Sequence, residues 1–322
     1  MKEPITVGSL LVLFSLLGLQ LICIESIKAV DRGHVVLRAT GSALQWFEQN
    51  GWPNEGQVSY QVSIYVSSLF WNSPAYNHGY YGNDVAVSKS NILGLIQEYN
   101  SYNYATFFIY THGINHTLYD VVYAYMGPIQ GWVPVAYYPV EHYQFWDSYD
   151  QAVNDHEIWP KTSSGVNYFV FIWACAQGKE IGSYHASYWL YYPFVWYAGT
   201  GAAGMPCAWI RRDYTQMSSD GYANPDSSPY CFIGFEGWSK PMSEQIDGTN
   251  KNYGDFAKIF YQNLLQNGRS INDALDAASL SLWGVYFTDT ILYNGYWDNV
   301  PGRGLWFGKM HVYGNGDNTL PH

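Results

Sequence analysis

YATFFIYTHG, residues 104–113, is an apolar and aromatic run that ends at His112 and Gly113. NYFVFIWACAQG, residues 167–178, repeats this pattern and ends at Ala174 and Cys175. Short β-branched and aromatic runs bounded by Asn and Gly are typical of buried strands. The sequence therefore predicts two core strands, each followed by a reactive side chain.

Strands and helices are predicted to alternate around these two segments. Further apolar runs predict strands at 34–38, 61–67, 231–234 and 304–314. Apolar residues at helical spacing predict helices within 87–103, 254–268 and 269–283, with Ser88 or Ser90 and Ser270 as start signals and Gly268 as a stop signal. This alternation favours an α/β fold, a mostly parallel central sheet covered by helices on both faces.

The two strand ends suggest a site. In open α/β sheets, loops that follow the carboxyl ends of neighbouring strands meet at one edge. Adjacent strands lie about 4.8 Å apart, so His112 and Cys175 could face each other across a cleft. A thiol beside an imidazole is the pair that thiol nucleophilic catalysis requires. Gly113 would let a backbone N–H approach an oxyanion closely.

The order of these motifs resembles the caspase-like cysteine peptidases, which include caspases, legumains, clostripains and gingipains. CFIGFEGWSKPM (231–242) and FYQNLLQNGRSINDALDAA (260–278) are similar to segments of the gingipain-type branch. VYGNGDNTLP (312–321) resembles its closing motif, with Asn318 where Pro is usual. The resemblance spans about residues 60–320 and implies a caspase-like three-layer α/β/α sandwich, with residues 27–322 as a single peptidase domain.

This resemblance also implies a mechanism. Cys175 would attack the scissile carbonyl and His112 would protonate the leaving amine, while the backbone N–H groups of Gly113 and Cys175 would hold the oxyanion. The substrate would be a peptide or protein, with no cofactor and no metal ion.

The residues that would choose the substrate are less well marked. Trp238 and Glu236 are candidates for a substrate pocket, and Asp84 could supply charge for a basic substrate side chain. Asp84 and Asp120 are also candidates to orient His112. Structural roles remain the alternative for each of them, since exposed carboxylates and core Trp residues are common.

Residues 114–166 form an aromatic insertion between the two key strands. Its centre reads GWVPVAYYPVEHYQFW, which could line or cover the cleft. Asn115, His116 and Thr117 make a glycosylation sequon close to Gly113, so a glycan at Asn115 would crowd the site.

Composition and the N-terminus point to export. The 322-residue chain has a formal net charge of −11, with 13% charged and 19% aromatic residues, which disfavours nucleic-acid binding. Residues 1–26 contain an apolar run typical of a signal peptide, and we expect a secreted or cell-surface protein. The alternative is a retained anchor, the one case in which a membrane would be a partner.

Three cysteines remain once this leader is removed. Cys207 and Cys231 flank a loop rich in Asp, Ser and Gly, and a disulfide between them is expected in an oxidising compartment. Cys175 would then be the odd thiol, although a lone Cys on an apolar strand is often only a small buried hydrophobe.

Two other classes of function stay open. His112 and His116, with Glu141 and His142 downstream, could belong to a metal hydrolase, but the His pair follows a strand and no His-Glu-x-x-His motif is present. A catalytically inactive caspase-like surface protein could instead use its many Tyr and Trp side chains to bind glycans or protein partners.

Overall fold

The computed structural model describes residues 30–322, except 126–131, 164–165, 179–194, 198–203 and 211–216. The expected signal peptide, residues 1–26, lies outside the described residues. Among those described, no helix has the length and apolar character needed to cross a bilayer.

A seven-stranded sheet forms the centre of residues 31–322, in the order β10-β11-β9-β7-β3-β1-β2. The strands β2, β1, β3, β7 and β9 run parallel, whereas β11 and β10 complete one edge as an antiparallel pair. The bounds are β1 (Arg32–Arg38), β2 (His78–Asn83), β3 (Tyr104–Tyr110), β7 (Asn167–Trp173), β9 (Cys231–Gly237), β10 (Tyr296–Val300) and β11 (Gly304–Gly314).

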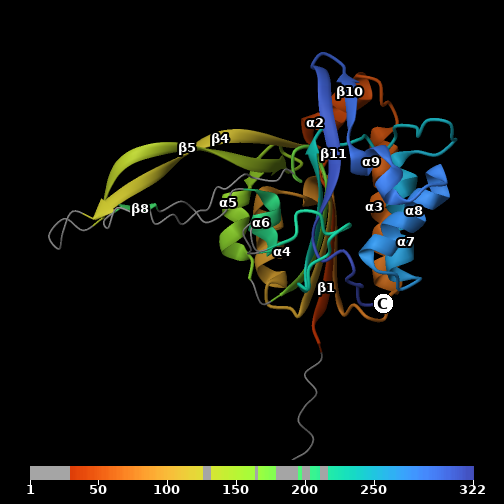
Figure 1. The fold of residues 1–322 in the computed structure, drawn as a ribbon, viewed down its shortest axis with the longest axis horizontal. Helices are drawn as coiled ribbons and strands as arrows, with labels where there is room; N and C mark the ends of the chain where they lie inside the picture. Colours follow the sequence, from red (N-terminus) through yellow and green to blue (C-terminus); the bar gives the residue numbers. More distant parts are fainter. Residues whose placement is uncertain (1–29, 126–131, 164–165, 179–194, 198–203, 211–216) are drawn as a thin grey trace, which may run out of the picture. The chain divides into compact units, whose positions relative to one another are not determined.

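Helices cover both faces of this sheet (Figure 1). One layer holds α2 (Gly41–Gln49), α3 (Glu55–Asn72), α7 (Tyr253–Leu265), α8 (Ile271–Trp283) and α9 (Ile291–Asn294). The other holds α4 (Lys89–Tyr99), α5 (Asp155–Ile158) and α6 (Met205–Ile210). The expected α/β sandwich with a mostly parallel central sheet is therefore confirmed.

Alternating strand residues build the two halves of the core. In β3, Phe108 and Tyr110 pack with α3 and α7, whereas Phe107 and Ile109 pack with α4 and α6. This alternation follows from the two-residue period of a strand, and continuous apolar runs are expected where both faces are covered.

Three helices follow the predicted patterns. In α4, Ile92, Leu95, Ile96 and Tyr99 are buried, and the Ser88 hydroxyl accepts a hydrogen bond from Asn91 N at 3.3 Å. Ser270 caps α8 in the same way, through Asp273 N at 3.1 Å. The predicted helix at 254–268 is α7, which ends at Leu265, before the predicted stop at Gly268.

The strand predicted at 61–67 is wrong, because this segment lies inside α3. Val62, Val66 and Phe70 recur every four residues and are all buried. Ser59, Ser63 and Ser67 recur with them and are also buried, so small side chains share the packed face. The alternation of β-branched residues suggested a strand, but the segment forms a helix that packs against β1 and α7.

The aromatic insertion folds largely as a long ribbon. Strands β4 (Gly113–Tyr125) and β5 (Trp132–Trp146) pair antiparallel, with β6 (Ala152–Asn154) and β8 (Val195–Tyr197) at the two edges (Figure 1). The ribbon begins one residue after His112. The root of the insertion therefore lies next to the expected catalytic pair.

The expected disulfide between Cys207 and Cys231 is not formed, because Cys231 carries a free thiol. Cys231 begins β9 and belongs to the core half beneath α7 and α8. Cys207 lies in α6 and packs against the opposite core half. The sheet separates the two residues, whereas a disulfide needs Cα atoms within about 7 Å.

Candidate functional site

The sheet brings His112 and Cys175 to the same edge. Strands β3 and β7 are adjacent and parallel, and Tyr110 pairs with Trp173. His112 and Cys175 each lie two residues beyond that pair. Thr111 N extends the contact between the two chain segments by donating to Trp173 O at 3.2 Å.

Both side chains also lie toward the α3/α7 side of the sheet. Cys175 belongs to the core half that contains Phe47 and Trp238. The His112 ring packs edge-on against Phe47, with centroids 6.3 Å apart, and against Trp146 at 5.0 Å. No hydrogen bond joins His112 to Cys175 among the described residues, so the pair shares a face without being locked together.

A sharp turn follows Cys175. Ala176 adopts a left-handed conformation with φ of 61°, which is uncommon for a residue with a Cβ. Ala176 N donates to Gly237 O at 2.7 Å, and Gly178 N donates to Phe235 O at 2.8 Å. These bonds to β9 hold the turn in its unfavourable conformation.

The Cys175 thiol is buried beneath Ser239. Cys175 is 2% exposed, and Ser239 N donates to its sulfur at 3.4 Å, with the Ser239 hydroxyl also at 3.4 Å. Burial raises the pKa of this thiol, and the bonds from Ser239 and the charge of Arg303 offset only part of that shift. The thiol is therefore neutral at pH 7.

His112 is neutral as well. Burial, followed by the positive charge of Arg303, lowers the pKa of His112 to about 4, against the opposing effect of Asp150. Its Nδ1 is buried without a hydrogen-bond partner among the described residues. At pH 7 the site therefore holds a neutral thiol and a neutral imidazole rather than a preformed ion pair.

We expect stability to fall as the pH drops from 6.5 toward 4. Burial also lowers the pKa of His34 to about 4. Between pH 4 and 6.5 these two histidines bind protons in the unfolded chain but stay neutral in the folded chain. The free energy of unfolding therefore rises with pH in this range. Each shift of about 2.5 units contributes on the order of 3 kcal/mol. Urea unfolding at pH 4.5, 5.5 and 6.5 measures this slope, and an unchanged slope in His112→Gln and His34→Gln would contradict it.

Gly113 is required where β4 leaves the site. A Cβ built on Gly113 would lie 2.2 Å from the Cys175 carbonyl oxygen and 2.3 Å from Gln177 Nε2. That nitrogen donates to the Cys175 carbonyl at 2.8 Å and to Gln144 O at 2.9 Å, so the contact is with a fixed backbone. Gly113 thus allows the His and Cys turns to approach each other.

Gly113→Ala is expected to destabilise the protein by roughly 3 kcal/mol, because overpacking against a fixed backbone displaces the Cys175 turn. Gly94→Ala is the matched control. Gly94 lies in α4 with open space around its missing Cβ, so Ala should stabilise that helix by up to about 1 kcal/mol. Chemical denaturation compares the two, and equal effects would refute the close approach.

A hollow of about 370 Å³ lies beside the Cys175 turn. Its walls include Ala176, Glu236, Trp306 and Tyr143. Glu236, one of the predicted pocket residues, therefore borders a cavity next to the turn after Cys175, with its carboxylate bonded to His311 Nε2 at 2.9 Å. Trp238, the other predicted pocket residue, is only 1% exposed and does not line this hollow. It packs among Trp46, Phe47 and Trp52 and against the lining residue Trp306.

Two other predicted residues lie apart from the pair. Asp84 follows the edge strand β2, two strands from β3, and forms an ion pair with Arg38 at 3.0 Å. Asp120 lies well along β4, where its backbone pairs with Tyr138. The side chains of Asp120 and of the sequon residue Asn115 lie outside the described set. The Asp84 carboxylate is therefore not placed to orient His112.

Two charged residues near the pair carried no sequence signal. Arg303 lies in the turn between β10 and β11, and its guanidinium stacks on Trp46 at 5.0 Å and on Trp306 at 6.0 Å. Its charge acts on both His112 and Cys175. Asp150 acts on His112 and holds the start of α2 through Ser42 N at 2.8 Å. Only tertiary packing brings these distant segments to the site.

Among the residues expected for a metal hydrolase, the side chains of His116 and Glu141 lie outside the described set, and that of His142 is not directed to His112. The imidazole of His142 instead bonds to Asp155 at 2.7 Å. In the ribbon, the backbone of His116 pairs with His142 and that of Thr117 with Glu141.

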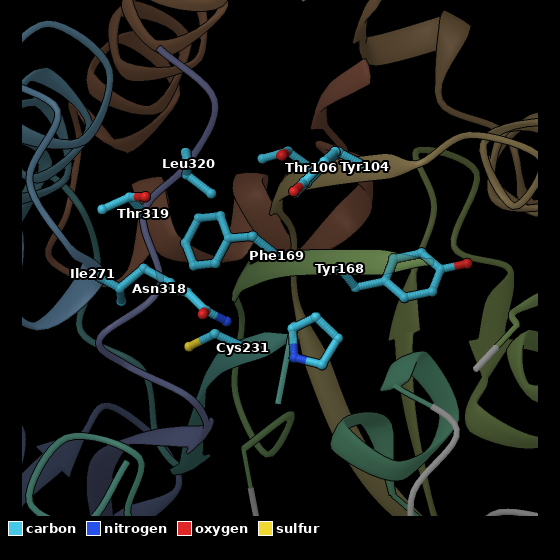
Figure 2. Close-up of a pocket in the computed structure, with 10 residues that line it drawn as sticks. Tyr104, Thr106, Tyr168, Phe169, Cys231, Ile271, Asn318, Thr319 and Leu320 are labelled. Atoms are coloured by element: carbon cyan, nitrogen blue, oxygen red, sulfur yellow. The ribbon is translucent and has the colours of Figure 1, made fainter. Parts of the chain in front are cut away.

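A second cavity, of about 220 Å³, lies at the opposite edge of the sheet. Figure 2 shows it between the starts of β3, β7 and β9 and the C-terminal residues Asn318 to Leu320, with the Cys231 sulfur at its wall. Because it adjoins the amino ends of the parallel strands, it is separate from the His112 and Cys175 edge.

Comparisons with known proteins add little to this geometry. Neither a protein-family model nor a curated protein matches the sequence. Similar solved structures include the Drosophila initiator caspase Dronc, with TM-score 0.37, 8% identity, and coverage of 92% of this chain and 88% of that one.

A Geobacter sulfurreducens protein has TM-score 0.36 and 12% identity over 78% of this chain and 89% of that one. Caspase-1 from Spodoptera frugiperda has TM-score 0.38 and 10% identity over 91% and 92%. Similarity at this level carries no argument about function, which has to come from the site.

Proposed function

We propose that this chain is a caspase-like cysteine peptidase that acts outside the cell, with Cys175 as nucleophile and His112 as general acid and base. One observation carries the proposal: adjacent parallel strands end in these two residues, both two positions beyond the Tyr110 and Trp173 pair. The gingipain-type branch and secretion rest on sequence resemblance and the leader.

The two neutral groups set the chemistry. His112 accepts the thiol proton as Cys175 Sγ bonds to the scissile carbonyl carbon. The imidazolium then protonates the amine as the C–N bond breaks, and water hydrolyses the thioester. When the sulfur attacks, the carbonyl oxygen becomes an oxyanion, and the backbone N–H groups of Gly113 and Cys175 stabilise it. Substrate binding must first move Ser239 off the sulfur, because its N and Oγ both lie 3.4 Å from it.

The charges around the cleft favour an acidic substrate residue. Asp84 is paired with Arg38, and Glu236 with His311. Arg303 is exposed and has no ion pair among the described residues, and its positive charge acts on both His112 and Cys175. This reverses our expectation of a basic substrate side chain.

A peptide library of mixed charge tests this function. Wild type should cleave, with a preference for acidic residues that Arg303→Ala removes and Arg303→Glu reverses. Cys175→Ala should abolish cleavage altogether. Cleavage that continues in Cys175→Ala would overturn the peptidase proposal, whereas an unchanged preference in Arg303→Glu would overturn only the role of Arg303.

A non-catalytic binding protein is the second candidate function. The observation that favours it is the raised thiol pKa together with the burial of Cys175 beneath Ser239. Saturable binding of glycans or a protein partner by a chain that cleaves nothing would favour this candidate.

A further inference from the structure

A second cluster of reactive side chains lies at the root of the ribbon. His142 comes from β5, whereas Asp155 and His156 are the first two residues of α5. One nitrogen from each imidazole and one Asp155 oxygen all lie within 4.8 Å of one another. His142 Nδ1 is 2.7 Å from Asp155 Oδ1, and His156 Nδ1 is 3.6 Å from the same oxygen.

The two oxygens of Asp155 have different tasks. Oδ2 accepts backbone bonds from Tyr143 N at 3.0 Å and Gly204 N at 2.6 Å, which fixes the carboxylate between β5 and the residue before α6. Oδ1 faces the two imidazoles and accepts His156 N at 2.7 Å. The backbone bonds to Oδ2 thus fix the orientation of the carboxylate. Metal ligands are usually held in this way by hydrogen bonds to their other atoms.

Charge and hydrogen bonding leave this cluster incomplete. Asp155 is fully buried, and its ionic partners among the described residues are His142 and His156, with no Lys or Arg. His156 Nδ1 is buried without a hydrogen-bond partner in the described part of the chain, at a distance too long for a bond to Asp155. A buried polar atom in this state costs free energy unless another group satisfies it.

We propose that His142, Asp155 and His156 bind a Zn²⁺ ion, with water as the fourth ligand. Tetrahedral bonds of about 2.0–2.1 Å place ligand atoms about 3.3 Å apart. The 3.6 Å separation of His156 and Asp155 is close to this value, and the 2.7 Å separation of His142 and Asp155 must open slightly as the proton between them leaves. Two imidazoles with one carboxylate suit Zn²⁺, whereas Ca²⁺ and Mg²⁺ prefer oxygen ligands.

The ion would join β5 to α5 beside the catalytic turn. Gln144, two residues along β5 from His142, accepts the bond from Gln177 that also reaches the Cys175 carbonyl. The site is independent of peptidase activity, because none of its ligands belongs to the catalytic pair.

The test uses the full chain in a Cys175→Ala background, which removes the catalytic thiol as a competing ligand. After dialysis against chelator, Zn²⁺ titration calorimetry should give one equivalent, and Co²⁺ should give the intense visible bands of tetrahedral coordination. His156→Ala should lower Zn²⁺ affinity at least about 100-fold, since even outer contacts are worth about 10- to 100-fold. His78→Ala, at an exposed His paired with Asp31, should leave it unchanged.

X-ray absorption at the zinc edge needs no variant and should show nitrogen and oxygen ligands, with imidazole scattering and no sulfur. Absence of saturable Zn²⁺ binding, equal affinity in His156→Ala, or a sulfur ligand would each overturn the proposal. In those cases the cluster serves only to hold β5 and α5 together through hydrogen bonds.

Discussion

Glu55→Gln is expected to lower the free energy of unfolding by roughly 3 kcal/mol and to expose Cys175. Glu55 is fully buried, and its carboxylate accepts Met242 N at 2.9 Å, Ser243 N at 2.7 Å and the Tyr110 hydroxyl at 2.7 Å. The Gln side chain has only one oxygen, and its NH₂ group would face one of these donors. A buried N–H group would then lose its acceptor. Each such orphan costs about 1–3 kcal/mol, and loss of the charge adds to this.

The same substitution should release the segment that covers the thiol. Ser239 lies three residues before Met242. Trp173 Nε1 donates a hydrogen bond to the carbonyl oxygen of the intervening Lys240 at 2.7 Å. Alkylation of Cys175 should therefore become faster in Glu55→Gln. Glu48→Gln is the control, because Glu48 is exposed at the neighbouring helix and should change stability by less than about 0.5 kcal/mol. Equal stability losses in the two variants would contradict the role of Glu55.

His112→Gln is expected to lower kcat/KM by about 1,000-fold, within the range for a lost general acid and base. In wild type, kcat/KM should decrease as the pH drops through about 4, where His112 becomes protonated. This acid limb lies near pH 4 because burial lowers the pKa of His112 to about 4. An ordinary histidine would give a limb near pH 6.5. The limb should disappear in His112→Gln.

His78→Gln supplies the control for this experiment. His78 is exposed, lies at the start of edge strand β2, and pairs with Asp31. Its replacement should leave both rate and pH profile unchanged. An acid limb near pH 6.5 in wild type, or full activity in His112→Gln, would contradict the assignment.

Local sequence was sufficient for the parts that local physics controls. The segments 104–113 and 167–178 predicted β3, β7 and the two reactive ends, because continuous apolar runs fit a sheet covered on both faces. Serine caps and apolar spacing predicted α4, α7 and α8. Gly113 was predicted to let a backbone N–H approach an oxyanion, which stays a prediction, and its close contact with the Cys175 carbonyl was not predicted.

Features that depend on packing between distant segments were not predictable in this way. The segment 61–67 alternates like a strand, but its Ser and Val rows pack as a helix face. The strand β2 lies at the sheet edge and has no apolar run. Arg303 comes near His112 and Cys175 only because β10 and β11 form the end of the sheet, and Cys207 and Cys231 are kept apart by the sheet itself.

The most direct test of the account is covalent labelling of the folded protein by peptidyl ketones that trap thiol nucleophiles. Intact mass and peptide mapping should find one adduct, on Cys175, absent in Cys175→Ala and formed at least about 100-fold more slowly in His112→Gln. Labelling that appears only on unfolding, or that falls on Cys207 or Cys231 instead, would contradict a catalytic role for Cys175.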